Sequence, residues 1–266
     1  MTARRARILL LTPYPLLPAD SGGRLYALGN VTPLADEYEY HLLALANPEE
    51  RAEIERGGNA LREEYARWFA SVHFEERPLV PHEFDSDLRV LAHFLRHTVH
   101  RLPLMDLSYF QPRAIETARR LIAEHEIDWL EIHHLHAAFY RRFLPALPAV
   151  LVNHNLEQDL WPFWRREGGF APRRWVWNGF GALSRRFARA IETDNSLSFD
   201  ARAFISTRDL ERVPDTSGPR FLVPMPVETS PEKPTFALDR FRVLWIGGFG
   251  WAPNVCLLYT SPSPRD

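Results

Sequence analysis

The sequence predicts an α/β fold in which a parallel sheet is flanked by helices. Short apolar runs typical of buried strands alternate along the chain with amphipathic segments of helical period. Several of the apolar runs end abruptly in glycines, histidines or amides. In open parallel sheets the carboxyl ends of the strands line the ligand crevice, so polar groups at those ends are candidate site residues.

Composition limits the classes of function. The 266 residues are 45% hydrophobic, which is enough to fill a substantial core, and they carry a formal net charge of -2. We expect no binding to nucleic acid, because affinity for phosphates requires a concentrated basic surface. The single cysteine, Cys256, excludes an internal disulfide and a metal cluster built on cysteines.

Signals for export or membrane insertion are weak. No apolar run approaches the roughly 18 residues needed to cross a bilayer. The apolar run at residues 8–11 is too short for the core of a signal peptide. We therefore expect a cytoplasmic protein, with peripheral attachment to the inner face of the membrane as an alternative.

The first strand, over residues 7–12, leads through a proline-rich loop to Gly22, Gly23 and Arg24 and then to a helix. Glycines let backbone amides approach a ligand closely, and the start of a helix favours negative charge. A phosphate could therefore bind at this turn. The turn lacks the G-x-G-x-x-G pattern of dinucleotide-binding domains, and its alternative role is simply to connect the strand to the helix.

The next elements continue the alternation of strands and helices. They are a strand over 38–45, a helix over 48–70, a strand over 71–74, a helix over 85–100 and a helix over 112–125. His93, His97 and His100 share one face of the helix over 85–100. That face could bind a metal, but a solvated face is favoured because no carboxylate lies among the histidines.

Histidines and amides gather after two later strands, over 128–136 and 149–152. The first group is His133, His134 and His136, and the second is His154, Asn155 and Glu157. A helix over 137–144 separates the strands, so the two groups should adjoin at one edge of the sheet. Imidazoles there could ligate a metal, but they could equally form hydrogen bonds or transfer protons, which we favour.

Aromatic and basic residues interleave from 161 to 189. Such a mixture could bind a membrane surface or single-stranded nucleic acid. We favour a helix pair whose aromatic side chains enter the core while the arginines stay solvated. A strand over 203–206, a short helix capped by Thr207 and a strand over 221–223 follow.

Four prolines between 224 and 234 indicate a linker, after which a strand over 242–246 runs into Gly247 and Gly248. This unit resembles the opening of a second nucleotide-binding domain, but the helix that should follow is missing. We therefore expect a first domain over 1–224, a linker over 225–240, the start of a truncated domain over 241–255 and a non-native tail over 256–266.

Several motifs together resemble family 4 glycosyltransferases of the GT-B fold. The motifs, in chain order, are Gly22-Gly23-Arg24, His154-Asn155-Leu156-Glu157 with Trp161, Ile205-Ser206 with Asp209, Pro226-Val227, and Ile246-Gly247 with Trp251-Ala252-Pro253-Asn254. The chain is most similar to a bacterial subgroup with an H-N-x-E stretch and a G-x-x-x-W-x-P-N turn.

The resemblance implies two Rossmann-like domains that face each other across a cleft. The first would bind a sugar, lipid-linked or polysaccharide acceptor, and the second a nucleotide-sugar donor, with retention of configuration and without a metal or other cofactor. Gly22, Gly23, Arg24, Gly247 and Gly248 would then lie near the donor phosphates. The acceptor side would be lined by His133, His134, His136, Asn155 and Glu157, with His154 as the candidate catalytic residue.

The chain departs from that family at its end. The paired glutamates of the donor domain, E-x7-E, and its basic residues would lie beyond Asn254, so we expect the 266-residue polypeptide to lack transferase activity. The alternatives are a nucleotide-sugar 2-epimerase and a non-catalytic carbohydrate-binding half-domain. A nicotinamide oxidoreductase is disfavoured because the dinucleotide fingerprint is missing.

Overall fold

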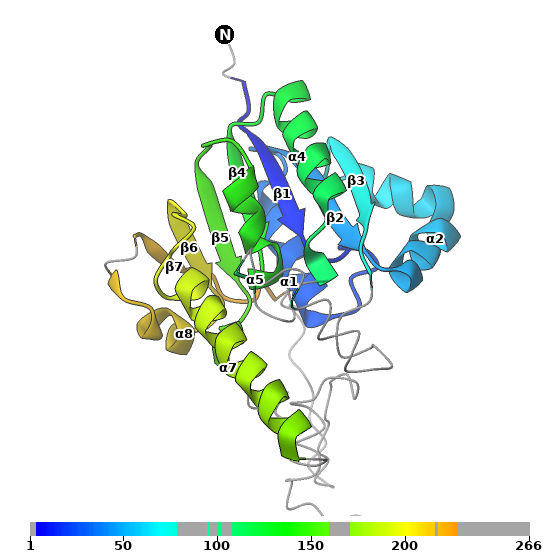
Figure 1. Cartoon of the computed structure of the whole chain (residues 1–266). Coiled ribbons are helices and arrows are strands. Elements are labelled where there is room, and N and C mark those ends of the chain that lie inside the picture. The colour runs from blue at the N-terminus through cyan, green and yellow to red at the C-terminus, as the bar shows by residue number, and fades with distance from the viewer. Residues whose placement is uncertain are drawn as a thin grey trace, which may run out of the picture. The chain divides into compact units, whose positions relative to one another are not determined.

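The computed structural model describes residues 4–78, 95, 101–102, 108–159, 171–215 and 218–227 (Figure 1). The chain divides into two compact units, Met1–Met225 and Pro226–Asp266. Apart from Pro226 and Val227, every described residue belongs to the first unit. The predicted linker over 225–240 lies largely outside the described residues, and the predicted second domain with Gly247 and Gly248 lies wholly outside them.

Within the described residues, seven parallel strands form one sheet in the order β3-β2-β1-β4-β5-β6-β7. The strands are β1 Arg7–Thr12, β2 Glu39–Ala46, β3 Ser71–Glu76, β4 Trp129–His133, β5 Ala149–Asn153, β6 Ala201–Phe204 and β7 Arg220–Leu222. The strand order reverses between β1 and β4, which is where open parallel sheets form their ligand crevice. The predicted fold class is confirmed.

Helices cover both faces of this sheet (Figure 1). They are α1 Gly22–Val31, α2 Pro48–Ala66, α4 Pro112–Glu124, α5 Leu135–Ala138, α7 Ala171–Glu192 and α8 Thr207–Arg212, with short 3-10 turns η1 Thr32–Leu34, η5 Phe139–Phe143 and η6 Glu157–Asp159. Leu9 and Leu11 pack with α4, α5, η5 and α7, whereas Ile8 and Leu10 pack with α1 and α2. Burial on both faces explains why the central strand β1 is continuously apolar from Ile8 to Leu11.

The structure corrects the predicted element boundaries around the histidines. β4 ends at His133, and not at 136, because His134 adopts a φ of 67° that ends the extended backbone. The predicted helix over 137–144 begins earlier, as α5, and continues as the 3-10 turn η5. Thr207 was wrongly predicted as a helix cap: Ser206 is the cap, and its side chain accepts a hydrogen bond from the Asp209 amide.

Other boundaries differ in length. α2 ends at Ala66 instead of residue 70, and Gly58, with a φ of 54°, interrupts it. Residues 171–192 form one helix, α7, while residues 160–170 of the predicted helix pair lie outside the described part. His93, His97 and His100 of the predicted helix over 85–100 lie outside it as well. None of the described helices is long and apolar enough to cross a membrane.

Candidate functional site

The candidate site lies where β1, β4 and β5 end. Tyr14 follows β1, and its hydroxyl lies 2.6 Å from Nε2 of His134, which follows β4. Gly23 of α1 packs against this pair: a Cβ added to Gly23 would lie 2.3 Å from the Tyr14 oxygen and 3.6 Å from His134 Nε2. The glycine turn and the histidine-rich strand end, about 110 residues apart in sequence, are therefore in contact.

The ends of β4 and β5 are joined by a line of polar side chains. His133 Nδ1 lies 3.0 Å from His154 Nε2, and His133 Nε2 lies 2.7 Å from Oε1 of Glu131. His133 is fully buried and His154 nearly so. The predicted proximity of the two histidine groups is confirmed.

A second cluster surrounds the Glu157 carboxylate in the first turn of η6. Its Oε1 accepts a hydrogen bond from Asn155 Nδ2 at 2.6 Å. The same oxygen lies 3.9 Å from His134 Nδ1 and 4.0 Å from His136 Nε2. The ring of Tyr109 stacks on His136, with the centroids 4.7 Å apart. All the predicted acceptor-side residues thus lie in one region at the end of the sheet.

Burial sets the protonation of these groups. It lowers the pKa of His134 and of His154 well below 6.5, and the neighbouring imidazoles act in the same direction. Burial also raises the pKa of Tyr14, so the phenol keeps its proton. The neutral phenol can then donate to His134 Nε2, which leaves the Nδ1–H of His134 directed toward Glu157. These groups offer hydrogen bonds rather than formal positive charge.

His134 is held in a strained backbone conformation. Its φ of 67° and ψ of 152° are rarely adopted by residues other than glycine and cost about 1–3 kcal/mol. The amide of His134 donates to the Val152 carbonyl at 3.0 Å, and the Tyr14 hydroxyl holds the ring. Strain of this kind concentrates at functional sites, because the surrounding structure must maintain it. Within the described ranges, no group of three His, Cys, Asp or Glu residues is arranged to hold a metal ion.

Comparisons with known proteins give fold-level likeness only. No protein-family model matches the sequence, and no curated protein matches it significantly. The N-terminal domain of trehalose-6-phosphate phosphatase from Candida albicans aligns at 14% identity and a TM-score of 0.40, covering 84% of this chain and 49% of that one.

Two solved transferases align similarly. The spinosyn forosaminyltransferase SpnP aligns at 12% identity and a TM-score of 0.37, and the alignment covers 87% of this chain and 54% of the SpnP chain. A UGT transferase from Siraitia grosvenorii in complex with UDP aligns at 11% identity and a TM-score of 0.37, and the alignment covers 81% of this chain and 50% of the transferase chain. This chain therefore spans about half the length of these structures.

For the predicted phosphate-binding turn, the structure bears differently on the two glycines and on Arg24. Gly22 and Gly23 open α1, Ser21 makes no side-chain cap, and no atom lies within 4 Å of a Cβ added to Gly22. Contact between these amides and a phosphate stays a prediction. Arg24, predicted to join them, has a largely buried side chain that pairs with Asp20 at 3.1 Å and with Glu50 at 3.5 Å. Since carboxylates neutralise its charge, we remove Arg24 from the proposed phosphate contacts.

Tyr14, Glu131 and Glu192 are among the site residues that were missed from the sequence. Tyr14 sits in a proline-rich loop with no distinguishing pattern, and Glu131 had a signal only in lying two residues before His133, on the same side of the strand. Glu192, at the end of α7, had none. Its carboxylate accepts hydrogen bonds from the amides of Glu157 at 2.6 Å and Gln158 at 3.1 Å, so α7 holds the loop after β5.

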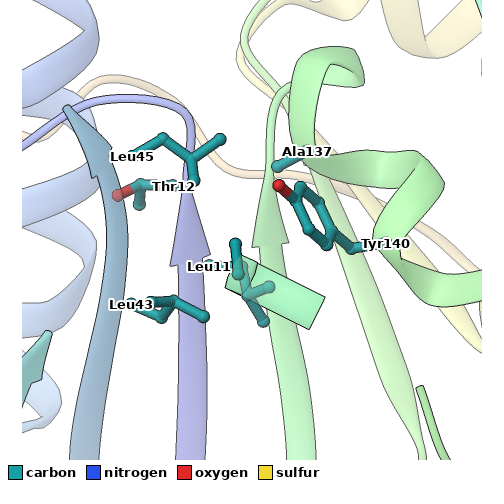
Figure 2. A pocket seen from close by; sticks show the side chains of 7 residues that line it. Leu11, Thr12, Leu43, Leu45, Ala137 and Tyr140 are labelled. Carbon is teal, nitrogen blue, oxygen red and sulfur yellow. The ribbon is translucent and has the colours of Figure 1, made fainter. Parts of the chain in front are cut away.

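A hollow beside β1 and β2 is not part of the site (Figure 2). Its lining is Leu11, Thr12, Leu43, Leu45, Ala114, Ala137 and Tyr140, and its empty volume is about 180 Å³ including open solvent. Its two hydroxyl groups are already engaged, since Thr12 donates to the Tyr14 carbonyl and Tyr140 to the Tyr109 carbonyl. The enclosed part of that space is only about 10 Å³, far below the roughly 300 Å³ or more of typical small-molecule sites.

Proposed function

We propose that the first unit is the acceptor-side domain of a retaining GT-B glycosyltransferase, which transfers a sugar from a nucleotide-sugar to a sugar, lipid-linked or polysaccharide acceptor. The observation that supports it best is the contact of Gly23 with the Tyr14–His134 pair at the point where the strand order reverses. Gly23 of the first motif and His154 of the second, from distant segments of the chain, both lie against His134.

In this proposal the diphosphate of the donor is bound by amides rather than by a metal. The first turn of α1 offers the amides of Gly22 and Gly23 and the positive end of a helix dipole. Such fixed donors would stabilise the charge that develops on the leaving diphosphate. Gly247 and Gly248 would contribute from the second domain, and His154 would contact the transferring sugar.

Substitution of Gly22 by Asp tests the phosphate contact. The side chain has space, and a carboxylate in the first turn of a helix is electrostatically favourable, so the fold should be kept. We expect Gly22→Asp to weaken binding of UDP and GDP, measured by calorimetry, by roughly tenfold or more, because a negative charge replaces the phosphate site. Gly22→Ala is the matched control and should bind both nucleotides as the wild type does.

Failure of the wild-type chain to bind any nucleotide diphosphate would contradict the phosphate contact at α1, and binding of a carbohydrate without any nucleotide would favour a non-catalytic carbohydrate-binding module. Conversion of a nucleotide-sugar into its epimer without an acceptor would identify a 2-epimerase. Transfer of a sugar to an acceptor by the purified 266-residue chain would support the proposed glycosyltransferase function. It would also contradict the expected inactivity of this polypeptide.

A further inference from the structure

The helix α7 presents a basic face to solvent. Its inner side packs on the core, where Ala188 and Ile191 are buried and Phe180 lies against the same cluster. Exposed residues recur every three or four positions on the other side, as expected for one face of a helix. These residues are Trp175, Gly179, Ala182, Arg186 and Arg189, with Arg185 beside them.

The charge of α7 has one sign on this side. Its 22 residues include five arginines and one acidic residue, Glu192. Glu192 is fully buried and accepts from backbone amides of η6, so its charge does not offset the exposed face. Within the described residues, no acidic side chain pairs with Arg185, Arg186 or Arg189. Since the whole chain has a formal net charge of -2, this face is a local concentration of positive charge.

The helix α4 shows the opposite arrangement. It also exposes three arginines, Arg113, Arg119 and Arg120. Glu116 and Glu124 are exposed on the same helix, and Arg120 pairs with Glu124 at 3.0 Å. Charges of both signs are typical of a face that only meets water. The uniform sign of α7 therefore distinguishes it from an ordinary solvated helix.

Trp175 adds a large apolar group to the basic face. Its side chain is 70% exposed, although we expected the aromatic residues of this segment to enter the core. The N-terminal half of α7, which contains Trp175, runs past the ends of the neighbouring strands (Figure 1). Tryptophan combines an apolar ring with a polar N–H, and it concentrates where membrane hydrocarbon meets water.

We propose that α7 docks on an anionic lipid bilayer through the face formed by Trp175, Arg185, Arg186 and Arg189. The guanidinium groups lie among the lipid phosphates, and the ring of Trp175 inserts between the headgroups. Trp175 and Arg189 are 14 residues apart, so the face is about 21 Å long and spans several lipids.

The observations favour a bilayer over a nucleic acid. Binding of single strands relies on several aromatic side chains that stack on successive bases. Among the described residues of α7, Trp175 is the exposed aromatic side chain, since Phe180 and Phe187 are half-buried. The proposal does not depend on a transferase activity, because it concerns a surface of the first unit and not its candidate site.

Cosedimentation of the 266-residue chain with lipid vesicles tests the docking. The probes are vesicles of phosphatidylcholine alone and vesicles of equal parts phosphatidylcholine and phosphatidylglycerol. We expect binding to the mixed vesicles only, and weaker binding as sodium chloride is added, because salt screens exposed charges. Equal binding to both kinds of vesicle, or binding that salt does not change, would overturn the proposal.

Replacing the three arginines tests which surface binds. The triple variant Arg185→Gln, Arg186→Gln and Arg189→Gln should partition about 100-fold more weakly, since each basic residue near an anionic surface contributes about fivefold. Glutamine is nearly as favourable in helices as arginine, so the urea midpoint of unfolding should stay close to that of the wild type. Replacing the same three arginines by Lys should preserve binding.

The helix α4 supplies the matched control. The triple variant Arg113→Gln, Arg119→Gln and Arg120→Gln removes the same formal charge from another exposed helix. It should bind the mixed vesicles as the wild type does. Equal losses for the two triple variants would show that net charge rather than the α7 face governs binding, which would overturn the proposal.

Insertion of Trp175 is tested by fluorescence. Lipids brominated close to the headgroup quench tryptophans that enter the bilayer, so the wild type should lose fluorescence when it binds. Trp175→Ala should show less quenching and bind about 3- to 10-fold more weakly, because less apolar surface leaves water. Quenching equal to that of the wild type would contradict the insertion.

Two further measurements separate this proposal from others. A single-stranded oligonucleotide that binds more tightly than the mixed vesicles, and loses affinity in the α7 Gln variant, would overturn the lipid assignment. UDP and GDP should bind that variant as they bind the wild type. Vesicle binding without nucleotide binding would support docking while the phosphate contact at α1 fails, and the reverse result would overturn docking alone.

Discussion

At the scale of single residues, the contact between Gly23 and Tyr14 distinguishes the roles of the two glycines in the turn before α1. The two glycines look equivalent in sequence, but only Gly23 lies against a side chain. Its missing Cβ leaves room for the Tyr14 hydroxyl, and that hydroxyl holds the ring of His134 at 2.6 Å. Gly23 thus has a packing role in the site, whereas Gly22 faces open space and is available to a ligand.

Substitution of Gly23 by Ala should therefore destabilise the protein. A Cβ at 2.3 Å from the Tyr14 oxygen forces the phenol away from His134, at a cost of about 1–3 kcal/mol in the free energy of unfolding measured with urea. Gly22→Ala should change that free energy by less than about 1 kcal/mol. In a Tyr14→Phe background the Gly23→Ala cost should shrink; an equal cost in both backgrounds would show that the phenol hydroxyl is not the obstacle.

Stability should fall below neutral pH because of the buried imidazoles. The folded protein holds the pKa of His134 and His154 well below 6.5, so between pH 6.5 and those lowered values the unfolded chain binds more protons. The stability that the neutral His134 and His154 contribute is fully present above pH 6.5. It is lost on acidification, by up to about 1.4 kcal/mol per pH unit for each of the two histidines.

The lowered pKa values of His41 and His73 act in the same direction. Urea unfolding at pH 7.5, 6.5 and 5.5 measures the slope, which His134→Gln and His154→Gln should each reduce. A free energy of unfolding that stays level or rises as the pH falls from 6.5 to 5.5 would contradict this prediction.

At the scale of elements, α7 supports the site through its last residue. Glu192 is fully buried, and its carboxylate accepts from two backbone amides of η6. Glu192→Ala should cost about 2–4 kcal/mol in unfolding free energy, since two buried amides lose a charged acceptor, and should speed hydrogen exchange at Glu157 and Gln158.

Glu124 offers the matched control at the end of α4. It is an exposed partner of Arg120, so Glu124→Ala should cost less than about 1 kcal/mol. Similar losses for the two glutamates, or unchanged exchange at Glu157 and Gln158 in Glu192→Ala, would mean that α7 does not hold the loop.

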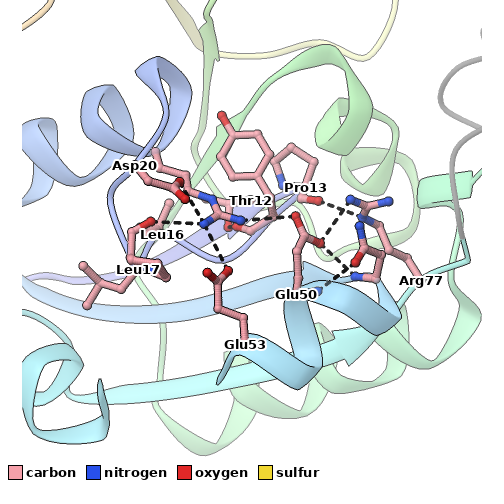
Figure 3. A network of polar contacts seen from close by, with 12 residues as sticks. Thr12, Pro13, Leu16, Leu17, Asp20, Glu50, Glu53 and Arg77 are labelled. Atoms are coloured by element: carbon pink, nitrogen blue, oxygen red, sulfur yellow. Dashed lines mark hydrogen bonds and ion pairs between the residues drawn. The ribbon is translucent and has the colours of Figure 1, made fainter. Parts of the chain in front are cut away.

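The start of α2 fastens the loop after β1 (Figure 3). Glu50 forms a capping box with Asn47 and pairs with Arg77 at 3.1 Å and with Arg24 at 3.5 Å. Glu50→Ala should destabilise by about 3–5 kcal/mol in urea unfolding, because two largely buried guanidinium groups lose a partner.

Glu53, on the same helix, is more exposed and pairs with Arg24 at 3.6 Å. Its replacement by Ala should cost less than about 1 kcal/mol. The ratio of the two losses reports whether Glu50 has the larger role, and a Glu53→Ala loss equal to that of Glu50→Ala would refute it.

At the scale of the whole molecule, the first unit holds all the described strands and their packing clusters. The four clusters of buried apolar residues draw on both faces of the sheet and lie within residues 8–225. A chain ending at Val227 should therefore unfold in one cooperative transition, followed by circular dichroism. Its urea midpoint should match that of the corresponding transition in the 266-residue chain; loss of the transition would show that the second unit is needed for folding.

Local sequence patterns determined the architecture and the position of the site. β1 was predicted with its observed bounds and β5 to within one residue, because each strand is an apolar run bounded by turn residues or polar groups. The histidine groups were placed at one edge because parallel strands end on the same side of the sheet. Element ends such as that of β4 were missed, since the φ of His134 depends on its tertiary contacts.

Only the tertiary structure decided which side chains act on one another. Tyr14 and His134 are 120 residues apart, and Glu192 lies 35 residues from the amide of Glu157. Strand register, the path of α7 and burial create these partnerships, and none of them has a local sequence pattern. The same reason applies to Arg24: the family resemblance implied a phosphate contact, but the fold surrounds its guanidinium with Asp20, Glu50 and Glu53.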